Sequence, residues 1–178
     1  VARLGSGESV PDIKPSSDKQ KQRAQLDYIQ KLNRNVLAKE DYQPAVEGII
    51  ESYELAFRMQ DVMPEMMDIS KETPAILAMY GADAGPSQTF GQQCLLARRF
   101  AEAGVRFIEV THGNWDQHTN LTVDHKARAE GCDKPIAGLL QDLKQRDMLK
   151  DTLVIWGGEF GRTPAAQGAD GRNHNNKG

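Results

Sequence analysis

The sequence predicts an α/β fold, with a mostly parallel sheet and flanking helices. The apolar run over residues 153–156 is too short and too continuous for an amphipathic helix, and residues 105–110 are rich in β-branched and aromatic side chains, so we expect two buried strands. Residues 121–147 between them have a helical period, and a parallel pair of strands needs a crossover of this kind. A polar loop follows each run. Since ligands of parallel sheets bind beyond the carboxyl ends of the strands, we expect the functional residues in these two loops.

The composition indicates a globular protein and gives no sign of a nucleic-acid-binding or membrane-spanning one. The chain has 178 residues, of which 39% are hydrophobic and 26% charged, as in a globular protein with one sizeable core. A net charge of −3 gives no electrostatic reason to expect a nucleic acid or an acidic membrane as partner. No apolar run approaches the roughly 20 residues that a transmembrane helix requires. The chain starts at Val1 and ends in a polar loop, so we expect it to be part of a longer protein.

The sequence divides into segments of different character. Residues 1–20 are rich in Gly, Ser, Pro and charge, and predict a surface segment or linker. Residues 21–178 predict one incomplete domain, with a helical part over 21–80 and a sheet and loop part over 88–178. In the helical part an apolar stripe at helical spacing follows Pro44.

Three local features of the helices carry further predictions. The methionines between Met59 and Met67 are expected to be adaptable packing residues. Cys94 and Cys132 fit neither a disulfide framework nor a zinc ribbon, so we expect two buried thiols. In the last long helix Pro135 is expected to mark a start or a kink.

The loop after the first predicted strand contains His112, Asp116 and His118. Asp116 and His118 are two residues apart, so in an extended segment their side chains project to the same side. Imidazole nitrogens and carboxylate oxygens are ligands of zinc and similar ions. The alternative is that these side chains only form hydrogen bonds within the loop. His125 is expected to be solvated on a helix, and Trp115 to be a packing residue.

The loop after the second predicted strand contains Glu159, Arg162 and His174. The planar guanidinium of Arg162 suits phosphate or sulfate oxygens, so we expect it to bind substrate. The alternative is a local salt bridge between Glu159 and Arg162, which are spaced i,i+3. Trp156, at the end of the strand, is expected to pack.

Several stretches resemble one bacterial family, domain of unknown function 1501. They include FGQQCLLARRF (residues 90–100), GVRFIEV (104–110), WDQHTN (115–120) and TLVIWGGEFGRTP (152–164). That family is similar to the alkaline phosphatase and sulfatase superfamily. The resemblance therefore implies an alkaline phosphatase-like sandwich, here a partial domain, and export to the periplasm or the exterior.

The resemblance also implies a metal centre. The superfamily places Asp-His-Gly after a strand, and these positions fall on Glu159, Phe160 and Gly161. An earlier Asp and His correspond to Asp116 and His118, and a late His to His174. The implied ligands of one divalent metal, of zinc or calcium/magnesium type, are Asp116, His118, Glu159 and His174.

This chain departs from the superfamily pattern at two positions. Phe160 cannot coordinate a metal, and Asn173 stands where the family usually has Asp. The nucleophile of the superfamily belongs to an upstream segment, so no catalytic residue is assigned here.

The resemblance implies a metal-dependent hydrolase of phosphate or sulfate esters, acting on an anionic small molecule or polysaccharide. A second hypothesis, favoured by Phe160 and Asn173, is an exported non-catalytic binding protein with a degenerate metal centre. A third is that both loops are purely structural connections.

Overall fold

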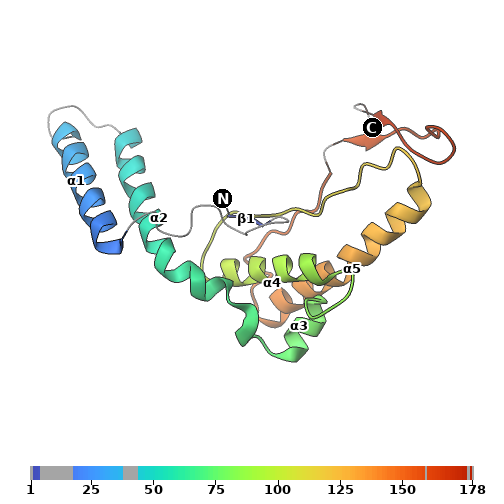
Figure 1. Cartoon of the computed structure of the whole chain (residues 1–178), viewed down its shortest axis with the longest axis horizontal. Helices are drawn as coiled ribbons and strands as arrows, with labels where there is room; N and C mark the ends of the chain where they lie inside the picture. Colours follow the sequence, from blue (N-terminus) through green and yellow to red (C-terminus); the bar gives the residue numbers. More distant parts are fainter. Residues whose placement is uncertain (1, 5–17, 38–43, 159, 176, 178) are drawn as a thin grey trace. The chain divides into compact units, whose positions relative to one another are not determined.

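The computed structural model of the chain describes residues 2–4, 18–37, 44–158, 160–175 and 177. The chain forms two compact units: Val10–Asp68, and Ile69–Gly178 together with Val1–Ser9. The fold is mixed α/β and mostly helical, with short strands (Figure 1). Within the described residues, no helix has both the length and the apolar character needed to cross a bilayer.

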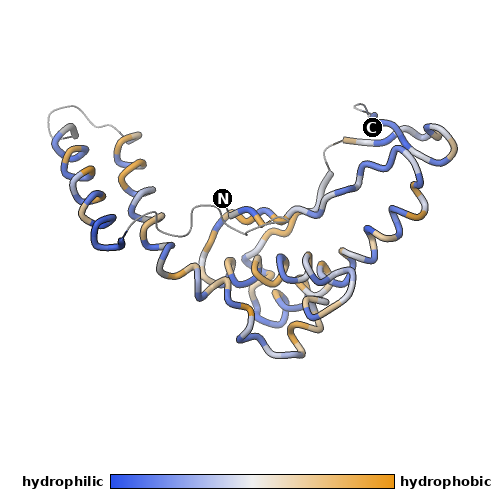
Figure 2. The backbone as a smooth tube through the Cα atoms, viewed as in Figure 1, coloured by the Kyte–Doolittle hydropathy of each residue, from blue (hydrophilic) through white to orange (hydrophobic). Residues whose placement is uncertain are grey.

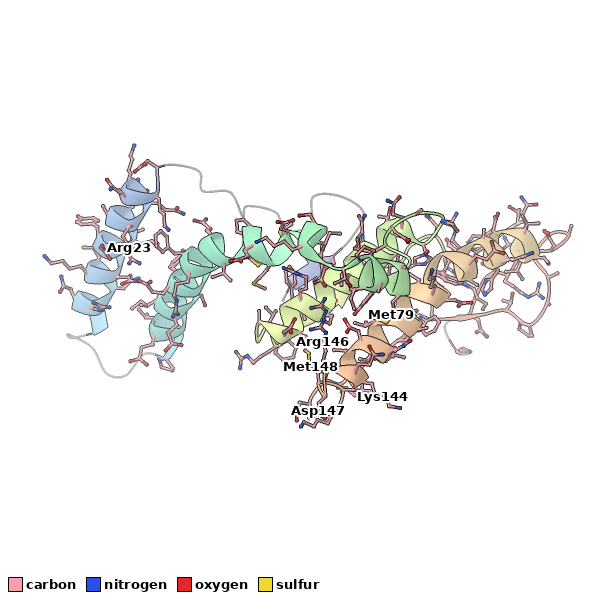
Figure 3. All side chains as sticks on the ribbon, turned by 90° about the horizontal axis from the view of Figure 1, so that it is seen from below. Arg23, Met79, Lys144, Arg146, Asp147 and Met148 are labelled. Atoms are coloured by element: carbon pink, nitrogen blue, oxygen red, sulfur yellow. The ribbon has the colours of Figure 1, made fainter. Side chains whose placement is uncertain are left out.

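The unit Val10–Asp68 contains the helices α1 (Lys19–Leu37) and α2 (Pro44–Met67). Two hydrogen bonds of 2.9 and 2.7 Å join the guanidinium of Arg23 on α1 to the Glu54 carboxylate on α2 (Figure 3). These bonds to Arg23 are the main reason why the pKa of Glu54 falls to about 2. A bidentate pair therefore fixes the register of the two helices.

The C-terminal part of α2 carries the methionines. Met63 is buried, with 1% of its surface exposed, and Met66 and Met67 are half-buried. These side chains are packing residues, as the sequence predicts. The Met59 side chain lies outside the described residues.

The other unit is built on three α-helices: α3 (Pro74–Tyr80), α4 (Gln88–Glu102) and α5 (Leu121–Gln145), with a short 3-10 turn, η1 (Ile69–Lys71), before them. The Thr73 hydroxyl caps α3 by accepting a hydrogen bond from the Ile76 amide. The helix α4 follows Pro86 and Ser87, residue types that favour a helix start, and ends before Gly104, a residue type that favours a helix end. Pro135 lies buried inside α5 rather than at its start.

These helices pack closely, and hydrophobic residues recur along α4 and α5 (Figure 2). Gly91 of α4 lies so close to α3 that a Cβ there would be 2.4 Å from the carbonyl oxygen of Tyr80. The core beside this contact includes Tyr80, Cys94 and Leu95. Cys94 and Cys132 are free and buried, which confirms the prediction. Burial, with a smaller contribution from Cys132, raises the pKa of Cys94 to about 12.

A buried charged network also joins these helices. Arg98 of α4 is 2% exposed, and it pairs with Glu72 at 2.7 Å and with Asp142 of α5 at 3.0 Å. The Tyr80 hydroxyl donates to Asp142 at 3.0 Å. Arg146, at the C-terminal end of α5 (Figure 3), donates to the other oxygen of Asp142 at 2.8 Å. Each buried carboxylate of this network therefore has a guanidinium beside it.

A short parallel sheet covers part of this unit. The strand β1 (Ala2–Leu4) pairs with β2 (Ile108–Val110), and Leu4 lies opposite Val110. The strand β2 falls within the predicted run over 105–110, but it is not the buried strand expected there, because Ile108 and Val110 are half-buried and Glu109 is exposed. The sequence did not predict β1, which lies in the stretch expected to be a linker. Leu4 is fully buried, so this short strand still anchors to the unit.

The second predicted strand, over residues 153–156, is wrong. Leu153, Val154, Ile155 and Trp156 are 85%, 39%, 81% and 72% exposed, and no strand is assigned to them. A strand needs a neighbour to satisfy its backbone groups. Among the described residues β1 is the strand that pairs with β2, and the run over 153–156 joins neither. Trp156 is therefore not a packing residue here.

Candidate metal centre

The loop between β2 and α5 turns sharply at two asparagines. Asn114 and Asn120 have φ values of 65° and 52°, in the left-handed region that asparagine tolerates better than most residues. The side-chain amide of Gln117, which is buried, donates to the carbonyl oxygen of Asn114. The amide of His118 donates to the carbonyl oxygen of Asp116 at 3.2 Å. These local bonds hold Asp116 and His118 in one compact turn.

The segment after residue 160 forms an antiparallel hairpin of two very short strands, β3 (Gly161–Arg162) and β4 (His174–Asn175). Arg162 lies directly opposite His174 in the register. Further along the hairpin, Gln167 and Gly171 exchange backbone hydrogen bonds of 2.8 and 2.9 Å. The pairing brings Arg162 and His174, which are 12 positions apart in the sequence, side by side.

The tip of the hairpin docks on the β2–α5 loop. The backbone N–H of Arg172 donates to the carbonyl oxygen of Gln117 at 3.0 Å. The backbone N–H of Asn120 donates to the Asp170 carboxylate at 2.9 Å. A Cβ at Gly171 would lie 1.7 Å from the carbonyl oxygen of His118, so only glycine fits there. This docking fixes His118 relative to the hairpin.

Three predicted ligands meet at this junction. Oδ1 of Asp116 lies 3.0 Å from Nε2 of His118 and 3.0 Å from Nε2 of His174. The two Nε2 atoms are 3.2 Å apart. Glu159, the fourth predicted ligand, lies outside the described residues.

The three donor atoms fit a divalent metal ion. Zinc binds imidazole nitrogen and carboxylate oxygen at about 2.0–2.2 Å, which in a tetrahedron separates ligand atoms by roughly 3.3–3.6 Å. The separations of 3.0 to 3.2 Å between Asp116, His118 and His174 are slightly tighter, so a small outward movement would admit the ion. Two nitrogens and one oxygen suit zinc better than calcium or magnesium, which prefer oxygen ligands.

Arg162 faces the same carboxylate oxygen. Its Nη1 atom lies 2.5 Å from Oδ1 of Asp116, and its Nη2 atom donates to the carbonyl oxygen of Trp115 at 3.4 Å. The Nη1 atom is buried, and the ion pair is close without the alignment of a hydrogen bond. Arg162, and after it His174, hold the pKa of Asp116 below its usual range. The carboxylate thus already has a cation beside it.

The aromatic residues of the site pack rather than coordinate. The Phe160 ring lies 4.4 Å from the His174 ring, and the Arg162 guanidinium lies 5.4 Å from the Phe160 ring centre. His112 accepts a hydrogen bond from Trp115 Nε1 at 2.8 Å instead of joining the donor cluster. Burial, and then the charge of Arg128, lowers the pKa of His112.

The predictions for Trp115 and His125 are confirmed. Trp115 is half-buried against His112 and His125, as expected of a packing residue. His125 is exposed on α5, as expected.

Sequence reasoning missed one residue of the site. Oε1 of Gln167 lies 2.7 Å from Nδ1 of His118. An amide in a polar loop has no distinctive sequence signal, because its role depends on the ring that it contacts.

No curated protein and no solved structure matches the chain. The model of the family described as "Protein of unknown function (DUF1501)" matches residues 4–178, and the chain belongs to this family.

Proposed function

We propose that Asp116, His118 and His174 hold one divalent metal ion of the zinc type, and that the site serves the hydrolysis of phosphate or sulfate esters. The observation that carries the proposal is the convergence of three donor atoms from two segments. His174 is 56 residues from His118 in sequence, yet their Nε2 atoms are 3.2 Å apart. The side chains of Asp116, His118 and His174 are 55%, 38% and 48% exposed, so an ester can reach them.

The residues of the site have distinct parts in this reaction. A bound metal would supply Lewis acidity to a phosphoryl or sulfuryl oxygen. Once a metal faces the Asp116 carboxylate, Arg162 is free to bind a nonbridging oxygen through its planar fork. The Phe160 ring packs against the His174 ring. Glu159 is the proposed fourth ligand, and no nucleophile is assigned.

A relationship to the alkaline phosphatase and sulfatase superfamily is part of the same proposal. An alkaline phosphatase-like sandwich with a mostly parallel sheet is supported by the parallel pairing of β1 and β2 and by the long helix α5 after β2. The resemblance to the alkaline phosphatase and sulfatase superfamily also supports export to the periplasm or the exterior.

A second candidate function is a non-catalytic binding protein with a degenerate centre. It is favoured by the contacts of Asn173. The side-chain oxygen of Asn173 accepts a hydrogen bond from the backbone N–H of His174 at 2.8 Å, and its backbone N–H donates to the Thr163 hydroxyl. Asn173 thus serves the turn rather than a metal. The ion pair of Arg162 with Asp116 favours the same candidate, because Arg162 is then not available to a substrate.

Metal titration of the purified chain tests the metal site. We expect the wild type to bind about one zinc ion by calorimetry, and His118→Ala and His174→Ala to bind it at least about 100-fold more weakly. His125→Ala is the matched control, since His125 is an exposed histidine on α5 outside the cluster. Equal and weak binding by all four proteins would end the metal proposal.

Hydrolysis assays then separate the two functions. We expect aryl phosphate or aryl sulfate to be hydrolysed by the zinc-loaded wild type and not by Arg162→Ala, although this variant retains zinc. Full zinc binding without hydrolysis of either ester by any of these proteins would favour the binding protein.

A further inference from the structure

We infer that Gln167 is a positioning residue that selects the tautomer of His118 and turns its Nε2 lone pair toward Asp116 and His174. This inference rests on the proposed metal site and adds a residue to it. Oε1 of Gln167 lies 2.7 Å from Nδ1 of His118. A carbonyl oxygen can only accept, so Nδ1 carries the proton of the neutral ring and Nε2 is left with its lone pair.

The surroundings of Nε2 suit this tautomer to metal binding. The unprotonated Nε2 atom faces a carboxylate oxygen of Asp116 at 3.0 Å and Nε2 of His174 at 3.2 Å. In the metal-free protein the guanidinium of Arg162 already pairs with that carboxylate oxygen, so Nε2 of His118 need not donate to it. The same state of the ring is the one that a metal ligand requires, with the other nitrogen donating to an outer partner.

The hairpin holds Gln167 in place for this contact. Its backbone exchanges two hydrogen bonds with Gly171, and Gly171 lies directly against the His118 backbone. The neighbouring carboxylate of Asp170 accepts from the Asn120 amide and not from the imidazole. The amide of Gln167 is therefore supported from its own backbone, as outer partners of metal ligands need to be.

The test uses the full chain in three forms: wild type, Gln167→Ala and Gln167→Glu. Glutamate can only accept hydrogen bonds, so it preserves the proposed role and removes any role of the amide as a donor. Gln88→Ala is the matched control, because Gln88 is an exposed glutamine whose amide contacts a backbone oxygen of Asp83 in the α3–α4 connection.

The first measurement is the imidazole nitrogen NMR spectrum of the metal-free proteins at about pH 8.5, where histidine is ordinarily neutral. We expect the wild type, Gln167→Glu and the control to show His118 protonated on Nδ1. Gln167→Ala is expected to shift toward the Nε2-protonated form. An unchanged tautomer in Gln167→Ala would overturn the inference.

The second measurement is zinc affinity by calorimetry. We expect Gln167→Ala to lose about 10–100-fold in affinity, the usual effect of removing an outer partner, and Gln167→Glu to bind at least as tightly as the wild type. A loss in Gln167→Glu equal to that in Gln167→Ala would overturn the inference. A tautomer change without zinc binding by the wild type would refute the proposed metal function and still support the selection of the tautomer by Gln167.

Discussion

The network around Arg98 and the cluster around Asp116 both place arginine beside carboxylate, but they differ in burial and in balance. In the network, Arg98 and Asp142 are each 2% exposed, and two guanidiniums face Asp142. In the cluster, Arg162 and two imidazoles approach one carboxylate oxygen of Asp116, whose side chain is 55% exposed. Burial makes the first arrangement costly to disturb. Convergence at the surface makes the second available to a ligand.

The largest expected effect comes from breaking the buried network. Arg98→Ala removes one of the two guanidiniums beside Asp142 and one of the two beside Glu72, so we expect a loss of about 1.5–3 kcal/mol in the free energy of unfolding. Urea denaturation measures it. Lys126→Ala is the control, since Lys126 is 78% exposed and its pair with Glu130 is 3.9 Å long. A loss below about 1 kcal/mol would show that the network is not a stability element.

The next effect disturbs the surface cluster without substituting any of its three proposed ligands. Gly171→Ala places a Cβ against the His118 carbonyl oxygen, so the hairpin must move away and the zinc affinity should fall about 100-fold, as for loss of a ligand. Calorimetry measures it. Gly113→Ala is the control, because Gly113 belongs to the same loop as His118 and has nothing within 4 Å of its Cβ position. Unchanged affinity in Gly171→Ala would mean that the docking does not position the ligands.

Acid is expected to weaken the buried network. Burial alone would raise the pKa of Glu72, but its hydrogen bonds to Arg99 and Arg98 prevail and hold the pKa below the ordinary 4.5. A depressed pKa stabilises the fold fully above about pH 4.5, and the contribution is lost as the pH falls through the folded value. Urea midpoints between pH 7 and pH 3 should therefore fall less steeply in Glu72→Gln than in the wild type. Parallel curves would contradict the assignment.

The smallest effect on stability is expected at Arg162. The ion pair of Arg162 with Asp116 is half-exposed, so Arg162→Ala should change the free energy of unfolding by no more than about 1 kcal/mol. Its zinc affinity should rise, because a competing cation has been removed. Arg162→Lys keeps the charge without the planar fork, and should restore the wild-type zinc affinity but not the binding of phosphate. Weaker zinc binding in Arg162→Ala would instead make Arg162 a support of the site.

The helices were predictable because their signals are local. The apolar stripe after Pro44 and the breaks at Ser87 and Gly104 depend on neighbours in sequence, and α2 and α4 follow them. The strands were harder to predict, because a strand forms only beside a neighbouring strand, and the sequence pattern does not identify that neighbour. The strand β1 is three residues long, too short for a visible alternation. The run over 153–156 has the composition of a buried strand, but composition does not supply the neighbour that a strand requires.

The candidate site was predictable in part for the same reason. Asp116 and His118 are two residues apart and have side chains typical of metal ligands, so the loop itself revealed them. The expectation that the two post-strand loops meet placed His174 near them, but its assignment as a ligand came from the family resemblance, because nothing local connects it to His118, 56 positions away. Gln167 was not predictable, since its contact exists only after the hairpin has docked on the loop. Tertiary contacts thus decide which polar residues belong to the site.

The exposed run over residues 153–156 has a consequence for the solution behaviour of this chain. Leu153, Val154, Ile155 and Trp156 form an uncharged window of high β-propensity without proline, the composition from which cross-β fibrils assemble. Asp151 is the nearest charged residue before this window and opposes association by its charge. Two uncharged glycines follow the window on the other side. Unpaired main-chain groups in such a window can pair with the same window of another chain. We therefore expect association of this chain to start at residues 153–156.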